Sequence, residues 1–137
     1  MPKKRSPFWN QNSAACALLS SLAGTYLDLY FVGKGLYRFP HRLLPEIFPI
    51  NIVFTLIGLP LLTMVFLHVL TRVNPLGKAC LILIASLLMS IAEKLAERLG
   101  AFAHSDQWMH VYSFFGYLLF LTVISTVYFV AAQNSSA

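Results

Sequence analysis

Five side chains in the C-terminal half of the chain carry groups that can bind a ligand or transfer a proton. They are Glu93, Glu97, His104, Asp106 and His110, which fall within 18 residues of one another. Carboxylates and imidazoles are common metal ligands and common general acids and bases. Di-metal sites in helix bundles use a Glu-x-x-His spacing, and neither that pattern nor His-Glu-x-x-His occurs here. The sequence therefore predicts no metal site and no cofactor.

The spacing of Glu93 and Glu97 indicates a role other than surface pairing. The two residues are four positions apart, so on a helix they share one face and repel each other when both are ionised. Lys94 and Arg98 form a separate basic row, about 100° around the same helix. We therefore expect the Glu pair to bridge helices or to contribute to a binding site.

Asp28 is a second carboxylate in an apolar setting. It lies about one turn inside the end of an apolar run, and a charged group within a membrane span usually has a partner. The candidates are Lys34, Arg38 and His110.

The composition requires that these residues be positioned by membrane-spanning helices. Of 137 residues, 58% are hydrophobic and 11% are charged, whereas about a quarter are charged in ordinary soluble domains. Mean hydropathy is +0.69. This excludes a soluble enzyme domain. The net charge of +5 forms no basic stripe, which excludes a nucleic-acid partner, and no Walker, dinucleotide or Gly-x-Ser-x-Gly motif occurs.

Four stretches are long enough to cross a bilayer, which needs about 20 mostly apolar helical residues. The predicted spans are 13–32, 47–70, 76–99 and 108–132. The fold class is accordingly all-α: a polytopic membrane protein with four transmembrane helices in an up-down bundle, forming one domain over residues 1–137. Pro60, after Gly58, predicts a kink in the second span.

Each predicted span has a face of small or polar residues at 4, 3, 4 spacing, which favours packing between helices in lipid. These faces are Ala17, Ser21, Gly24 and Asp28; Asn51, Thr55, Gly58 and Leu62; Ser86, Ser90, Glu93 and Glu97; and Asp106, His110, Ser113 and Tyr117.

An up-down bundle places all five acidic residues at one membrane face. The opposite face offers little beyond His68, Arg72 and Lys78. The predicted binding cluster consists of Asp28, Arg38, Arg42, Glu46, Asn51, Glu93, Glu97, His104, Asp106 and His110. Arg38 and Arg42 are placed to meet a lipid phosphate.

The aromatic and thiol side chains have simpler predicted roles. Trp9 and Tyr37 fit an interfacial belt, and Tyr112 and Tyr117 are candidates to cap the polar cluster. The two cysteines, Cys16 and Cys80, lie within spans and are expected to be free thiols.

Basic residues near the span ends favour cytoplasmic termini. Lys94 and Arg98 are left out of the count because they lie within a helix beside Glu93 and Glu97. With the termini inside, five basic residues then lie on the inner side and three on the outer side. The inner residues are Lys3, Lys4, Arg5, Arg72 and Lys78, and the outer residues are Lys34, Arg38 and Arg42.

Three segments carry a family resemblance: GTYLDLYFVGKG with the following YRFP, LPEIFPINI through GLP, and 93–114 including HSDQW. Together they resemble a family of small multi-pass membrane proteins of endospore-forming Bacillus-type and clostridial bacteria. The likeness covers roughly residues 20 to 130. It implies a bacterial plasma membrane and a sporulating host, and because its motifs carry no known chemistry it assigns no catalytic residue.

The leading functional hypothesis is a small binding or accessory component of the cell membrane. Its expected partners are the lipid bilayer and either another membrane protein or a second copy. One alternative is an interfacial enzyme acting on a lipid headgroup, with His110 or a carboxylate as the base and Ser113 as the hydroxyl. Another is a small dimeric proton-coupled transporter in which Asp28 titrates.

Overall fold

The structure, a computed structural model, describes residues 10–136 and is mainly helical. The elements are α1 (Gln11–Gly33), β1 (Tyr37–Arg38), the π-helix η1 (Phe54–Gly58), α2 (Leu59–Leu70), α3 (Pro75–Arg98), β2 (Ala103–His104) and α4 (His110–Ser136). The all-α prediction is confirmed, with one addition: β1 and β2 form a short antiparallel pair.

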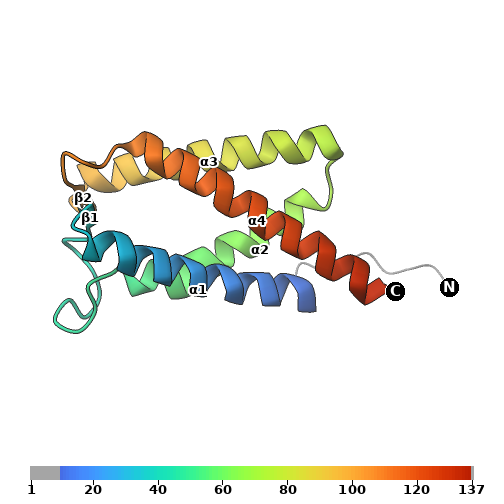
Figure 1. Ribbon diagram of the computed structural model, residues 1–137, viewed down its shortest axis with the longest axis horizontal. Coiled ribbons are helices and arrows are strands. Elements are labelled where there is room, and N and C mark those ends of the chain that lie inside the picture. The colour runs from blue at the N-terminus through green and yellow to red at the C-terminus, as the bar shows by residue number, and fades with distance from the viewer. Residues whose placement is uncertain (1–9, 137) are drawn as a thin grey trace.

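The helices run lengthwise and pack as two hairpins. α1 packs mainly on α2 and α3 mainly on α4, with smaller contacts between α1 and α4. In Figure 1 the connections 34–51 and 99–109 lie at one end of the molecule, which we call the loop end. The 71–74 connection, the first turn of α1 and the last turns of α4 lie at the opposite end, which we call the turn end.

Within residues 10–136, three helices are long and apolar enough to cross a membrane: Gln11–Gly33, Pro75–Arg98 and His110–Asn134. Their bounds agree closely with the predicted spans. Large apolar side chains such as Leu18, Leu88 and Leu119 are 58–68% exposed on the outside of the molecule. A surface of this kind is suited to lipid rather than to water.

The second apolar segment is shorter than the predicted 47–70 span. Its helix covers Phe54–Leu70, and the chain before it runs through turns and bends up to Asn51. Pro49 accounts for much of this, because a proline disfavours helical backbone at the residue before it. The Asn51 side chain then accepts a hydrogen bond from the Phe54 backbone N–H at 3.2 Å, as a helix N-cap residue does.

The irregularity predicted at Pro60 takes the form of the π-helix η1. Pro60 has no N–H to donate to the carbonyl four residues earlier. The Leu59 N–H instead bonds to the Phe54 carbonyl in the wider π-helical pattern. Such π-helical turns are a known source of helix bending.

All four helices meet near the turn end. The core there combines Cys16 of α1, Phe66, Leu67 and Leu70 of α2, and Leu121, Ile124 and Tyr128 of α4, with partly buried residues of α3 against it. Cys16 is a buried free thiol and Cys80 an exposed one.

Buried hydroxyls join α1 to the second apolar segment. The Ser21 hydroxyl donates to the Thr55 carbonyl at 2.8 Å, and the Thr63 hydroxyl donates to the Ser20 hydroxyl at 2.9 Å. The predicted small and polar face of α1 is therefore used for helix packing. In the second segment the inward residue is the fully buried Thr63, whereas the predicted Leu62 is only partly buried.

Two glycines end α1 and α3 in the same way and lead into the strand pair. Gly35 and Gly100 have φ angles of +76° and +83°, the left-handed conformation that ends many helices. After them, Tyr37 pairs with His104 and Arg38 with Ala103. The strand pair therefore ties the end of the first hairpin's α1 to the connection inside the second hairpin.

Candidate functional site

A group of hydrogen-bonded side chains lies at the loop end, between the last turns of α3 and the first turns of α4. We call it the polar cluster, and it consists of Glu93, Glu97, His104, His110 and Ser113. α3 presents the two carboxylates one turn apart on one face, β2 supplies His104, and α4 supplies the other two. Four of these residues belong to the predicted binding cluster, and Ser113 lies on the predicted inward face of α4.

Glu93 is the inner residue of the polar cluster and accepts three hydrogen bonds. The donors are the Ser113 hydroxyl at 2.5 Å, the His110 Nδ1 at 2.7 Å and the Trp108 indole N–H at 3.4 Å. Its side chain is only 14% exposed. Such complete pairing is what allows a carboxylate to be held in a largely buried place.

Glu97 lies one turn nearer to the solvent and contacts both histidines. Its Oε1 lies 3.1 Å from the His110 Nε2, and its Oε2 lies 3.0 Å from the His104 Nε2. The two imidazole rings stand nearly perpendicular, with centroids 5.1 Å apart. The Glu97 side chain is 34% exposed, so the outer part of the polar cluster is open.

The strand pair brings His104 into the polar cluster. Its partner in the pair is Tyr37, and the Ser105 N–H donates to the Leu36 carbonyl at 3.0 Å. Two-residue strands leave no periodic pattern in a sequence. Sequence reasoning therefore had no signal for this pairing.

Asp28 lies beside the polar cluster and is held by Tyr37. The Tyr37 hydroxyl donates to the Asp28 Oδ1 at 2.6 Å, so the partner is none of the predicted Lys34, Arg38 or His110. Burial, followed by the negative charge of Asp28, raises the pKa of the Tyr37 hydroxyl. Asp28 Oδ2 is buried and has no hydrogen-bond partner among the described residues.

Tyr37 does not belong to an exposed interfacial belt as the sequence predicts. It is 8% exposed and packs in an aromatic core with Phe102 and Trp108. Its ring centroid lies 5.0 Å from that of Trp108. The physical reason is the strand pair, which holds Tyr37 against the 99–109 connection and so buries its ring beside Phe102 and Trp108. Trp9, the other predicted belt residue, lies outside the described residues.

The remaining predicted residues lie at the loop end but outside the polar cluster. Glu46 and Asp106 are exposed in the connections, and Arg38 is exposed on β1. The Arg42 guanidinium donates to the carbonyls of Phe39, Phe48 and Pro45 and so orders its own loop. Asn51 caps the start of the second apolar helix. Tyr112 is 48% exposed, and Tyr117 is partly buried on α4.

Ser113 and His110 do not form a nucleophile and base pair. The Ser113 hydroxyl donates to Glu93, and both ring nitrogens of His110 face carboxylates. Activation of a serine requires a base within hydrogen-bonding reach of its hydroxyl. Among the residues that the structure describes, Glu93 occupies that position.

A groove on the outside of α3 and α4 leads to the polar cluster. It has a volume of about 420 Å³, and its lining is mainly apolar, with Ser90, Lys94 and His110 as its polar residues. The Ser90 hydroxyl donates to the His110 carbonyl at 2.9 Å. His110 therefore borders both the groove and the polar cluster.

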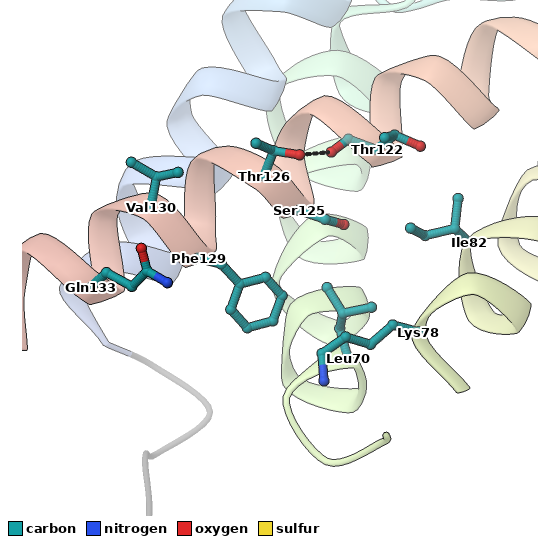
Figure 2. A pocket seen from close by; sticks show the side chains of 9 residues that line it. All are labelled: Leu70, Lys78, Ile82, Thr122, Ser125, Thr126, Phe129, Val130 and Gln133. Atoms are coloured by element: carbon teal, nitrogen blue, oxygen red, sulfur yellow. Dashed lines mark hydrogen bonds between the residues drawn. The ribbon is translucent and has the colours of Figure 1, made fainter. Parts of the chain in front are cut away.

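A second groove, of about 350 Å³, lies far from the polar cluster, near the turn end (Figure 2). Side chains of α2, α3 and α4 line it, among them Leu70, Ile82 and Phe129. The Lys78 ammonium donates to the Val73 carbonyl at 2.6 Å and lies over the Phe129 ring. The other polar residues of its lining are Thr122, Ser125, Thr126 and Gln133. Among the described residues, its lining therefore contains no carboxylate or imidazole comparable to those of the polar cluster.

Comparison of the chain with protein-family models, with curated proteins and with solved structures finds no match. The chemistry of the polar cluster must therefore be argued from its own geometry. Two carboxylates and two imidazoles in contact can bind a cation, accept hydrogen bonds from a ligand, or move a proton between their atoms.

Proposed function

We propose that the chain is a small binding or accessory component of the bacterial plasma membrane, and that the polar cluster is its binding site. The observation that carries this proposal is the position of Glu97, His104 and His110. These groups contact one another at one end of an apolar helical protein while remaining 23–34% exposed. Structural ion pairs alone would not require three ionisable groups to converge at an open edge.

The charges near the site favour a cationic or hydrogen-bond-donating ligand. Glu93 and Glu97 supply the carboxylates of the polar cluster and, one turn apart on α3, repel each other when both are ionised. The only cationic groups within the polar cluster are the two imidazoles, whose charge depends on protonation. A positively charged group of a small molecule or of a partner protein would relieve this repulsion.

We further propose that Phe54–Leu70 crosses the membrane as a fourth span and that both termini are cytoplasmic. Ile52 and Val53 are also helical, which brings the helical segment within the ~17–25 residues that a span uses. The first turn of α1 and the last turns of α4 lie at the same end of the molecule (Figure 1). An even number of crossings requires this arrangement.

The experiment that tests the binding role compares two double variants of the full chain. Glu93→Gln with Glu97→Gln removes both carboxylate charges of the polar cluster. Lys94→Gln with Arg98→Gln removes two charges from the same turns of α3 at exposed positions and is the matched control. Proteins are extracted from membranes, and the bound small molecules and cross-linked partners are identified by mass spectrometry.

The carboxylate variant is expected to insert into the membrane normally and to lose at least one bound species that the control variant retains. If both variants insert and retain the same species as the wild type, the polar cluster is not a binding site. Membrane fractionation and the helical circular dichroism signal establish that each variant is folded and inserted.

A further inference from the structure

We infer that Glu97, His104 and His110 bind one divalent transition-metal ion, for which Zn²⁺ is the reference ion. This inference rests on the proposed binding role and names the class of ligand. Each of the three residues offers one donor atom, and these atoms lie within 4.8 Å of one another. The sequence contains no helical metal motif, because the donors come from the end of one helix, a short strand and the start of another helix.

The hydrogen bonds of His110 determine which of its ring nitrogens faces Glu97. Its Nδ1 lies 2.7 Å from the Glu93 carboxylate, which can only accept, so the proton belongs on Nδ1. In the neutral ring, Nε2 then presents a lone pair. That lone pair points at another acceptor, the Glu97 Oε1, 3.1 Å away.

His104 repeats this arrangement with a different anchor. Its Nδ1 lies 2.8 Å from the backbone carbonyl of Ser105, which also can only accept. The proton therefore belongs on Nδ1, and the Nε2 lone pair faces the Glu97 Oε2 at 3.0 Å. With both rings neutral, two imidazole lone pairs and one carboxylate thus converge on the same small region.

Converging acceptors require a positive charge between them, which is either a proton on each Nε2 or a metal ion. A metal ion meets this need, and the anchors match the usual environment of metal-binding histidines. Such residues nearly always donate their other ring N–H to a carboxylate or a backbone carbonyl, which sets the tautomer and the ring orientation. His110 has the carboxylate of Glu93, and His104 has the carbonyl of Ser105.

The donor set selects the class of ion. Zn²⁺ binds nitrogen and oxygen at about 2.0–2.1 Å in tetrahedral sites, which places neighbouring donors about 3.3 Å apart. Glu97 Oε2 lies 3.0 Å from the His104 Nε2 and Oε1 lies 3.1 Å from the His110 Nε2, so each carboxylate oxygen is near this value for one imidazole. One donor atom from each of the three residues lies within 4.8 Å of the others, so the side chains would draw together around the ion. Mg²⁺ and Ca²⁺ prefer all-oxygen sites, whereas two imidazoles and one carboxylate are typical of Zn²⁺ and Fe²⁺ with an open coordination position.

The test measures Zn²⁺ binding to the full chain in detergent micelles. The protein is treated with a chelator, desalted and titrated with Zn²⁺ in competition with a chromogenic zinc indicator. The wild type is expected to bind one ion per chain, and excess Mg²⁺ should not compete. Binding should also raise the unfolding temperature, because a ligand that binds only the folded state stabilises it. Co²⁺ in place of Zn²⁺ should give the intense visible absorption of a four-coordinate site.

Variants separate the ligands from their surroundings. Glu97→Gln and His104→Gln should each weaken Zn²⁺ binding by more than ~100-fold. Glu93→Gln, which leaves the three ligands in place but alters the anchor of His110, should weaken it by about 10-fold. Asp106→Asn is the matched control, because it removes an exposed carboxylate from the same connection as His104 and should leave binding unchanged. Size-exclusion profiles and circular dichroism show whether each variant is folded.

The inference is overturned if the wild type binds no Zn²⁺, or if folded Glu97→Gln and His104→Gln proteins bind it as the wild type does. The three residues are then held by protonated imidazoles paired with Glu97. These outcomes can be distinguished from a failure of the binding role. If the carboxylate double variant loses a bound species while no Zn²⁺ binds, only the metal assignment fails. If Zn²⁺ binds through these residues but no other species depends on them, the metal is structural and the proposed role fails.

Discussion

At the scale of single residues, the partners of the buried carboxylates are determined by their need for hydrogen-bond donors. Glu93 needs donors in a largely buried place and finds three, from Ser113, His110 and Trp108. Asp28 finds one donor, the Tyr37 hydroxyl, for Oδ1. Its Oδ2 has no hydrogen-bond partner among the described residues. The hydrogen bond from the Tyr37 hydroxyl to Asp28 is therefore expected to contribute strongly to the stability of the protein.

Tyr37→Phe is expected to lower the stability of the protein by ~1–3 kcal/mol, because it leaves a buried acceptor without a donor. Thermal or denaturant unfolding in detergent measures the effect. Tyr112→Phe, at a half-exposed position, serves as the control and should change stability little.

A double-mutant cycle identifies the partner. In an Asp28→Ala background, Tyr37→Phe should have a much smaller effect than in the wild type. An equal effect in both backgrounds would show that the Tyr37 hydroxyl stabilises the protein through some other group.

At the scale of elements, the ends of the helices matter more than their middles. α1 and α3 each end two residues before a glycine with positive φ. After each glycine the chain continues into a strand of the β1–β2 pair. The Ala101 N–H bonds back to the Ala96 carbonyl at 2.8 Å, and the Leu36 N–H bonds to the Phe31 carbonyl at 3.1 Å. The pair in turn places His104 beside Glu97.

Gly100→Ala is expected to destabilise the loop end by ~1–2 kcal/mol, since an L-residue is strained in the left-handed conformation. Gly33→Ala is the matched control, because it has an ordinary φ and nothing within 4 Å of the added methyl group. Unfolding in detergent compares the two variants.

Zn²⁺ binding gives a second measurement that compares the Gly100→Ala and Gly33→Ala variants. If the turn at Gly100 positions His104, Gly100→Ala should also weaken Zn²⁺ binding while Gly33→Ala should not. Unchanged stability and unchanged binding in Gly100→Ala would show that the turn does not depend on the glycine.

At the scale of the whole molecule, the open question of topology is whether Phe54–Leu70 crosses the membrane. Four crossings put the 34–51 and 99–109 connections on one side and the 71–74 connection on the other. Three crossings put 34–51 and 71–74 on the same side and 99–109 on the opposite side. The two arrangements therefore differ at exposed, labelable positions.

Single cysteines at these positions test the fourth span in a chain whose Cys16 and Cys80 are first replaced. With a membrane-impermeant thiol reagent on intact cells, we expect Glu46→Cys and Asp106→Cys to be labelled. Arg72→Cys should be labelled only after permeabilisation. Labelling of positions 46 and 106 from opposite sides would contradict a fourth crossing.

Much of the architecture was predictable because it follows from local hydrophobicity. The bounds of α1, α3 and α4 follow from long apolar runs that end at polar residues or glycines. The 4, 3, 4 spacing identified Ser21, Thr55, Ser90, Glu93 and Ser113 as inward residues, since residues at this spacing share a helix face. The start of the second helix was predicted too early, because the apolar run continues through turns around Pro49 that composition does not reveal.

The sequence by itself determined that this is an apolar helical chain and which carboxylates and imidazoles lie near one end of its helices. Helical periodicity and apolar run length are local properties, so they can be read along the chain. Only the tertiary structure decided that Glu97, His104 and His110 meet, that Tyr37 turns inward to Asp28, and that Arg42 binds its own loop. The first two contacts depend on two glycine turns and a two-residue strand pair between distant segments, and such pairing has no periodic signal in the sequence. The Arg42 contacts depend on the turns of its own loop, which are equally aperiodic.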